Sequence, residues 1–179
     1  MDAIKIAEAG LTDIHDLEIL INSAYRGEGS KKGWTTEADL LDGIRTDPER
    51  LQEMIEKKGA VILTYRDEQD VLKGCVYLEK TNNKMYLGML TVSPNEQAKG
   101  IGKKLLRQSE KYALAHDADV MTMTVISVRS ELIAWYEKNG YYQTGERKPF
   151  PTDVRFGIPK QPLEFVVLEK KLPVIGADI

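Results

Sequence analysis

The chain has 179 residues, and its 42% hydrophobic and 30% charged residues are typical of a globular protein with a buried core. Its 25 basic and 28 acidic residues give a formal net charge of -3, which argues against a general nucleic-acid or membrane-surface binder. The single cysteine, Cys75, excludes an intrachain disulfide, and the sequence has no Cys/His metal cluster, signal-peptide pattern or membrane-spanning stretch, so we expect a cytoplasmic protein that holds no metal.

Hydrophobic periodicity in the first third of the chain predicts a strand and then helices. Ile4 and Ile6 lie on one face of an alternating segment, whereas the apolar residues from Ile14 to Ala24 recur at helical spacing. In chain order we expect a strand at 3–7, a helix at 14–24 capped by Thr12 or Asp13, a glycine-rich loop at 26–33, and helices at 35–44 and 49–57.

The rest of the chain alternates between apolar strands and two amphipathic helices. The expected elements are strands at 60–65, 71–80 and 84–92, a helix at 103–116, a strand at 120–126, a helix at 130–139, and strands at 141–147 and 163–172. Asn82 and Asn83 suit the tight turn of a hairpin, and Gly88 predicts a bulge or a close packing contact.

This order of elements predicts an α+β fold. The sheet should be mixed, mostly antiparallel and twisted, with about seven strands and with helices on both faces. Neither an internal repeat nor a linker divides the sequence. We therefore expect one domain over residues 1–179, with a loose tail at 172–179.

One stretch combines the features of an anion-binding site. An apolar strand that ends at 90–94 is followed by a glycine-containing turn and then by an amphipathic helix. The free N–H groups of a helix point out of its N-terminus, where the macrodipole adds roughly +0.5 charge. Gly100 and Gly102 lack a Cβ, so a phosphate could approach the backbone closely, and Lys99 and Lys103 add positive charge. The pattern predicts a site for a pyrophosphate group.

Two common phosphate-binding motifs do not fit this stretch. A P-loop needs Gly-Lys-Ser/Thr, but Lys103 is followed by Lys104, which has no hydroxyl for magnesium. A dinucleotide-binding turn needs a third glycine and parallel strands. Leu105 stands in the position of that glycine, and the preceding strand belongs to a predicted antiparallel hairpin. Both motifs are therefore rejected.

A third motif fits. Gln97-x-x-Gly100-x-Gly102, after a strand that ends at Pro94, resembles the acetyl-CoA motif of the GNAT N-acetyltransferases. A second segment at 132–141, with the sequence LIAWYEKNGY, is similar to the helix-to-strand segment of that family. The separation of the two segments and the order of elements along the whole chain also resemble the family.

The resemblance implies that acetyl-CoA binds where the sheet splays apart, at the end of the 84–92 strand. Its pantetheine would pair with main-chain groups of that strand as an added strand would, and the following turn would hold the pyrophosphate. The cofactor-binding residues that it implies are Leu90, Thr91, Val92, Gln97, Ala98, Lys99, Gly100, Ile101, Gly102 and Lys103.

The resemblance also places Tyr136 as the donor of a proton to the departing thiolate. A phenol of pKa about 10 that protonates a thiolate of pKa about 8.5 does so at a cost of about 2 kcal/mol. Without the resemblance, a core aromatic beside Trp135 would be the simpler interpretation. The 84–92 strand carries no acidic residue, so Glu79 on the neighbouring strand is the candidate base, which could act through water, or a solvent-facing glutamate at a strand end.

Loops that flank the opening in this family supply the candidate acceptor site. Trp34, Glu37, Phe150 and Asp153 could form a partly aromatic, acidic pocket for an ammonium group, or they could pack within their own loops. Arg129 stands where many family members carry an asparagine. It could contact a phosphate or an acidic substrate group, although a solvated residue at the start of a helix is the simpler interpretation.

The resemblance therefore predicts an acyltransferase that moves acetyl from acetyl-CoA directly to a primary amine of a small molecule or peptide. The alternative is a non-catalytic acyl-CoA-binding or regulatory module of the same fold. The resemblance to the family also makes a homodimer possible. We expect no nucleic-acid or membrane partner. The acceptor is not identified, because fold and cofactor do not fix the substrate.

Overall fold

The structure is a computed structural model, and it describes residues 5–26, 36–97, 99–151, 155 and 157–174. Its helices are α1 (Ile14–Tyr25), α2 (Pro48–Glu56), α3 (Ile101–Ala115) and α4 (Ser130–Lys138). Its strands are β1 (Lys5–Glu8), β2 (Leu41–Asp42), β3 (Ala60–Arg66), β4 (Leu72–Thr81), β5 (Lys84–Val92), β6 (Val120–Ile126), β7 (Tyr142–Pro149), β8 (Ile158–Pro159) and β9 (Glu164–Lys171).

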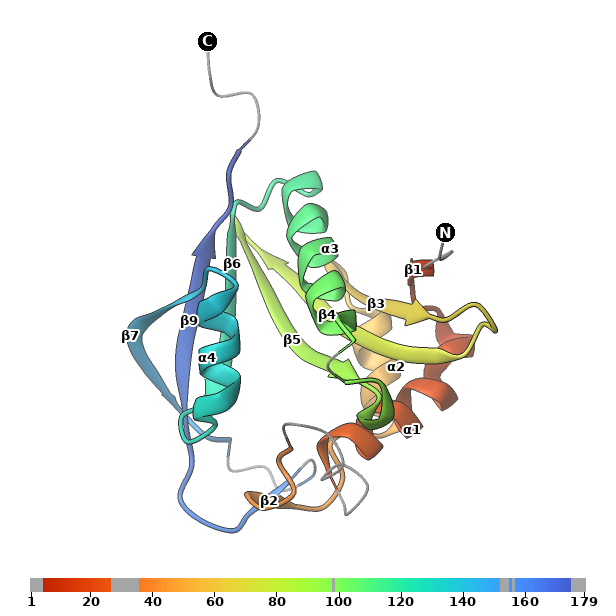
Figure 1. Cartoon of the computed structure of the whole chain (residues 1–179), viewed down its shortest axis with the longest axis horizontal. Coiled ribbons are helices and arrows are strands. Elements are labelled where there is room, and N and C mark those ends of the chain that lie inside the picture. Colours follow the sequence, from red (N-terminus) through yellow and green to blue (C-terminus); the bar gives the residue numbers. More distant parts are fainter. Residues whose placement is uncertain (1–4, 27–35, 98, 152–154, 156, 175–179) are drawn as a thin grey trace.

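Seven strands form one sheet in the order β1-β3-β4-β5-β6-β9-β7, and β2 pairs with β8. Every neighbouring pair is antiparallel except β5 and β6, which run parallel. β5 pairs with β6 only from Lys84 to Tyr86. Beyond Tyr86 the two strands diverge, and Figure 1 shows them meeting at one end and separating toward α1. The sheet is therefore open beside the second half of β5.

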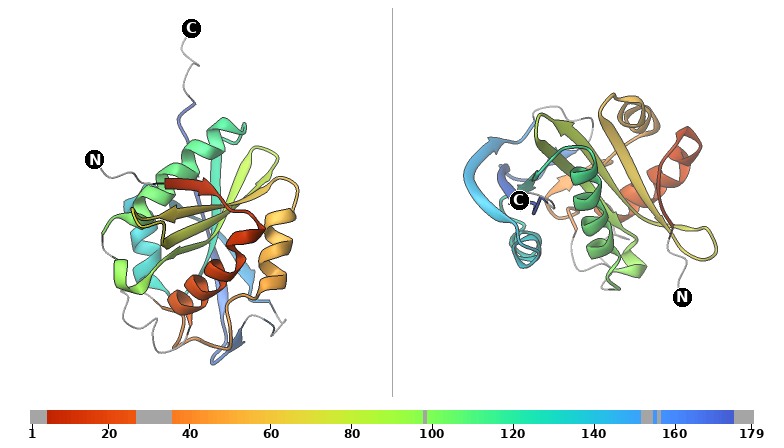
Figure 2. Two further views of the ribbon diagram at one scale, coloured as in Figure 1. Left: turned by 90° about the vertical axis from the view of Figure 1, so that its right-hand side faces the viewer. Right: turned by 90° about the horizontal axis from the view of Figure 1, so that it is seen from above.

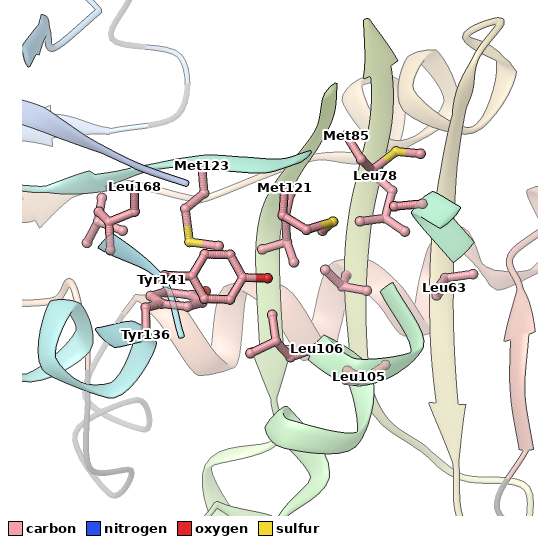
Figure 3. Close-up of a cluster of buried hydrophobic side chains, with 14 of the residues drawn as sticks. Leu63, Leu78, Met85, Leu105, Leu106, Met121, Met123, Tyr136, Tyr141 and Leu168 are labelled. Carbon is pink, nitrogen blue, oxygen red and sulfur yellow. The ribbon is translucent and has the colours of Figure 1, made fainter. Parts of the chain in front are cut away.

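Helices cover both faces of the sheet. α1 and α2 pack on one face of β3 to β5, and α3 packs on the other (Figure 2). On the α3 side, Leu105 and Leu106 point into a core that also contains Tyr136 of α4 beside Tyr141 (Figure 3). The predicted fold class is confirmed, with seven strands in one mostly antiparallel sheet and helices on both faces.

The helix predicted at 35–44 is wrong for the part of this segment that the structure describes. From Thr36 the chain makes a turn and then enters β2, where Leu41 pairs with Pro159. Leu41 is buried by this long-range pairing. Its apolar side chain therefore packs through a tertiary contact and does not belong to the apolar face of a helix. At the other end of the chain, Leu172 is buried and its N–H donates to the Asp119 carbonyl at 2.7 Å, so the chain is anchored to this residue at least.

Among the described residues, no helix combines the length and the apolar character needed to cross a membrane. The cytoplasmic location, the single domain and the homodimer stay predictions.

Candidate active site

A cavity of about 430 Å³ lies beside the open half of β5. We call it the helix cavity, because the N-terminus of α3 forms one of its walls. It is lined by Ala24, Tyr25, Leu90, Thr91, Val92, Glu96, Gln97, Gly100, Ile101, Gly102, Lys103, Arg129, Leu132, Trp135 and Tyr136. The predicted cofactor-binding residues all belong to this lining, except for Lys99 and for Ala98, which lies outside the described residues.

The start of α3 presents free backbone N–H groups at the cavity wall. Gly100 precedes the helix with a φ of +82°, a left-handed conformation that glycine adopts without steric cost. The Lys104 N–H donates to the Gly100 carbonyl at 3.1 Å, so the N–H groups of residues 101–103 come before the first bond of the helix. The first turn of α3 contains no acidic side chain to offset the helix dipole. This helix end can therefore bind an anion.

Gly102 keeps space open next to that helix end. A Cβ at this position would lie 3.6 Å from Cζ2 of Trp135 and 3.7 Å from Cγ2 of Val92, which are ordinary contact distances. Any larger side chain would extend toward these two lining residues. The absence of a side chain at Gly102 therefore leaves room for a ligand close to the backbone.

The end of β5 supplies main-chain acceptors to the lining of the helix cavity. The strand bulges at Met89, whose φ is +55°, and its register with β4 shifts there. Beyond the bulge, the Leu90 carbonyl accepts a hydrogen bond from the Tyr25 hydroxyl at 2.7 Å, and the Val92 carbonyl accepts one from Nε2 of Gln97 at 3.1 Å. Both carbonyls therefore belong to residues that line the helix cavity, and each is bonded to a side chain of the same lining.

One carboxylate lies among the cations beside the helix cavity. Glu96 binds Nζ of Lys99 at 2.8 Å and Nζ of Lys73 at 3.5 Å. The hydrogen bond from Lys99, more than the attraction of the two charges, holds the pKa of Glu96 below its usual range. Glu96 is therefore ionised near neutral pH and offsets part of the positive charge at this end of the cavity.

Tyr136 lies in a cluster of aromatic rings. Its side chain is 4% exposed, and its ring packs edge-on against Trp135 and Tyr141, with centroid distances of 5.0 and 5.7 Å. Burial raises the pKa of the Tyr136 hydroxyl above its ordinary value, and the guanidinium of Arg129 partly opposes this rise. The hydroxyl therefore stays protonated across the physiological pH range and can donate a hydrogen bond.

A second cavity, of about 170 Å³, adjoins the first. We call it the arginine cavity, because Arg26, Arg45 and Arg129 line it. Strands β5, β6 and β9 supply part of its wall. The residues common to both cavities are Tyr25, Arg129, Leu132 and Tyr136. The two cavities therefore adjoin at these four residues, one of which is Tyr136.

Glu37, which the sequence predicted to bind an ammonium group, lines the arginine cavity but is held by two arginines. Its Oε1 lies 3.0 Å from Nη2 of Arg26, and its Oε2 lies 3.2 Å from Nη1 of Arg129. The exposed fractions of these side chains are 9% for Glu37 and 6% for each arginine. The interpretation of Arg129 as a solvated residue is therefore wrong, and the charge of Glu37 is already compensated within the protein.

Glu79, the predicted base, lines neither the helix cavity nor the arginine cavity. Its carboxylate binds Nζ of Lys57 at 2.6 Å and accepts a hydrogen bond from the Tyr77 hydroxyl at 2.9 Å. The hydrogen bond from Lys57 is the main reason why the pKa of Glu79 lies below its usual range. A carboxylate of lowered pKa outside both cavities is a poor candidate for the base, and we do not keep it in that role.

The remaining predicted substrate residues divide into two groups. Phe150 lines the arginine cavity, and its ring centroid lies 5.2 Å from that of Phe165. Trp34 and Asp153 lie outside the described residues.

Tyr25, Arg26 and Arg45 are among the residues of the arginine cavity that the sequence analysis missed. Tyr25 follows the buried Ile21 by four residues, so the helical spacing could have placed its ring on the inner face of α1. Arg26 and Arg45 had no such signal, because a charged residue next to a loop usually points to solvent.

Comparisons with known proteins agree with this architecture. A family model described as the acetyltransferase (GNAT) domain matches residues 34–156. The fold is similar to that of the ribosomal-protein-S18-alanine N-acetyltransferase from Escherichia coli, with 11% identity, a TM-score of 0.71 and 98% of each chain covered. It is similar to a GNAT-family acetyltransferase from Staphylococcus aureus Mu50, with 18% identity, a TM-score of 0.69 and coverage of 96% of this chain and 100% of that one. A spermidine N-acetyltransferase chimera from Vibrio cholerae and hSSAT matches with 14% identity, a TM-score of 0.67 and coverage of 94% and 95%. No curated protein matches the chain.

Proposed function

The chain belongs to the acetyltransferase (GNAT) family, and we propose that it transfers the acetyl group of acetyl-CoA directly to a primary amine of a small molecule or peptide. In this proposal acetyl-CoA occupies the helix cavity, and the amine approaches through the arginine cavity. The observation that carries the proposal is that the two cavities adjoin at Tyr136, so a donor and an acceptor can meet there.

The side chains and backbone of the helix cavity fit an acyl-CoA. The N–H groups at the start of α3 suit a pyrophosphate, Lys103 adds positive charge, and Gly102 leaves room beside the backbone. Leu90 and Val92 line this cavity, and each carbonyl oxygen, which accepts one hydrogen bond from a side chain, has a second lone pair for an amide N–H. When bound, acetyl-CoA would supply the activated acetyl group.

The described residues suggest how the protein would assist the transfer. Tyr136 would donate its hydroxyl proton toward the sulfur, and a main-chain N–H near Thr91 could polarise the acetyl carbonyl. Among the described lining residues, the carboxylates are Glu37 and Glu96, and each already binds two cations. We therefore propose that the amine enters as the free base rather than losing its proton to a carboxylate.

Release of free thiol from acetyl-CoA tests this proposal. Release should require an added acceptor, and a panel of amino acids, small amines, polyamines and peptides should contain at least one that supports it. If acetyl-CoA binds but no acceptor supports release, the non-catalytic acyl-CoA-binding module would be favoured. ATP and NAD should displace acetyl-CoA poorly, because the stretch around Gly100 and Gly102 lacks the features of a P-loop and of a dinucleotide-binding turn.

Replacing Gly102 by leucine should weaken CoA binding at least tenfold, about 1.4 kcal/mol, because the side chain would fill space beside the helix end. Leucine is a better helix former than glycine by roughly 0.8 kcal/mol, so the melting temperature should not fall. The control is Lys111→Leu, at an exposed position of the same helix outside the cavity. Calorimetry that shows equal CoA affinity for the two variants would argue against the site.

Replacing Glu96 by glutamine should tighten CoA binding by roughly three- to tenfold at low ionic strength, because it removes a negative charge beside the phosphate site. The gain should shrink as salt is added, since Glu96 is partly exposed to solvent. Glu68→Gln makes the same charge change at an exposed residue outside both cavities and should leave the affinity unchanged. Weaker CoA binding by the Glu96 variant would show that this carboxylate does not oppose the ligand.

A further inference from the structure

The arginine cavity carries an excess of positive charge. Arg26, Arg45 and Arg129 line it, and Glu37 is the one carboxylate among its described lining residues. Three guanidinium groups less one carboxylate leave a formal charge of +2. Glu37 binds Arg26 and Arg129, and the carboxylate of Glu131 lies 3.9 Å from Nε of Arg129, so the excess positive charge is centred on Arg45.

Arg45 is the arginine of this cavity that Glu37 does not hold. Its guanidinium carbon lies 5.2 Å from the centroid of the Tyr25 ring, and Tyr25 belongs to both cavities. In the part of the chain that the structure describes, no carboxylate forms an ion pair with Arg45. The side chain thus brings an uncompensated charge to the cavity wall.

The backbone that carries Arg45 is fixed to α1. Oδ1 of Asn22 accepts hydrogen bonds from the N–H of Arg45 at 2.8 Å and from the N–H of Thr46 at 3.0 Å. Nδ2 of Asn22 donates to the Thr46 carbonyl at 3.0 Å. The Asn22 side chain therefore makes three hydrogen bonds to this loop and fixes the backbone from which the Arg45 side chain extends.

The positive charge discriminates between acceptors. It lowers the pKa of an amine in the cavity, which favours the neutral form that attacks the acetyl group. It also repels an acceptor with further cationic groups, such as a polyamine. An acceptor with an anionic group would instead offset the excess charge, and a guanidinium can bind a carboxylate through two parallel hydrogen bonds.

We infer that the acceptor is a small primary amine that carries its own anionic group, as an amino acid carries its carboxylate, and that Arg45 binds that group. The inference rests on the proposed acetyl transfer. The acceptor nitrogen forms a bond to the acetyl carbon as the carbon–sulfur bond breaks, and the proton lost by nitrogen balances the proton gained by sulfur. The cavity volume of about 170 Å³ suits a small molecule. Tyr86, Phe150 and Phe165 offer its side chain an apolar wall.

The test compares amino acids with amines that differ only in lacking the carboxylate. The pairs are leucine with 3-methylbutylamine, methionine with 3-(methylthio)propylamine, and phenylalanine with 2-phenylethylamine, and spermidine serves as the polycation. Thiol release at saturating acetyl-CoA should give at least one amino acid a kcat/KM tenfold or more above that of its partner. The phosphonic acid counterpart of leucine then shows whether the site accepts a carboxylate only or any anionic group.

The Arg45→Gln variant tests whether Arg45 causes the preference for an amino acid over its partner amine. The ratio of kcat/KM between the amino acid and its partner amine should fall at least fivefold, mainly through a higher KM for the amino acid. The ratio corrects for any loss of packing against Tyr25, since both compounds use the same variant. Arg50→Gln removes an equal charge from an exposed residue outside the cavity, so it should keep the wild-type ratio.

The outcomes separate this inference from the proposed function. Thiol release with spermidine or the plain amines at rates equal to or above those of the amino acids would overturn the inference and leave acetyl transfer intact. An unchanged ratio in Arg45→Gln would overturn the role of Arg45. Absence of release with every compound, while acetyl-CoA binds, would overturn the inference and the proposed function together.

Discussion

Tyr136→Phe is expected to lower the turnover of acetyl-CoA by about 10²- to 10⁴-fold, the range typical of a lost general acid. The substitution removes the hydroxyl of a residue that lines both cavities and keeps the ring that packs against Trp135 and Tyr141. The dissociation constant of CoA should change by less than about threefold, because the phosphate contacts lie at α3. Steady-state kinetics and calorimetry on the same preparation measure both quantities.

The control for this prediction is Tyr141→Phe. Tyr141 belongs to the same ring cluster, but its hydroxyl donates to Glu110 at 3.2 Å and it lines neither cavity. Its replacement should lower stability without a comparable loss of turnover. Equal turnover of wild type and Tyr136→Phe would remove Tyr136 from the mechanism.

The direction of the Tyr136 pKa shift adds a pH test. Burial raises this pKa above its ordinary value, so the hydroxyl keeps its proton to a higher pH than a free tyrosine does. Turnover should therefore not fall between pH 7 and about 10 through ionisation of Tyr136. The same shift makes complete proton transfer to sulfur harder than the sequence-based figure of about 2 kcal/mol assumed, and the cation of Arg129 opposes part of this cost.

Glu37→Gln is expected to destabilise the protein by about 3 kcal/mol, because it leaves two buried guanidinium groups without their shared carboxylate. For a chain of this size that loss corresponds to a fall of roughly 6 to 12 °C in the melting temperature. Thermal or urea unfolding measures the change. The variant should also bind amines no better than wild type, since Glu37 holds arginines rather than a ligand.

Glu53→Gln is the matched control for that experiment. Glu53 pairs with Arg50 at 3.3 Å, close to the distances around Glu37, but its side chain is 49% exposed. An exposed pair contributes about 1 kcal/mol or less, so the control should melt close to wild type. If the two variants melted together, the buried pairs around Glu37 would not be stabilising the loop that carries it.

Local patterns predicted most of the fold. In β6, Met121, Met123 and Val125 alternate with threonines, and the strand predicted at 120–126 is the observed one. The helix predicted at 35–44 failed where the pattern depended on partners far along the chain, because Leu41 is buried by pairing with Pro159. Alternation of apolar and polar residues along the chain directly indicates a half-buried strand. A single apolar residue in a loop does not indicate which distant residue it packs against.

The same division applies to the site. The helix cavity was predictable because its glycines and the start of α3 are contiguous in sequence, so one motif contains them. The arginine cavity was not, since its central ion pair joins Glu37 to Arg129 over a separation of 92 residues. The sequence around Glu37 and Arg129 does not indicate that either residue is buried, and Glu37 considered alone suggested a site for a cation. Only the fold shows that Glu37 already forms ion pairs with Arg26 and Arg129.

The most direct test of the account is to follow both products of the reaction with the amino-acid acceptor panel. Free CoA is measured by thiol release, and the acceptor is examined by mass spectrometry for an acetyl group on its nitrogen. The account predicts equal amounts of CoA and N-acetylated acceptor, formed by the wild type and nearly abolished in Tyr136→Phe. Thiol release without an acetylated amine, or acetylated amine formed equally well by both proteins, would contradict it.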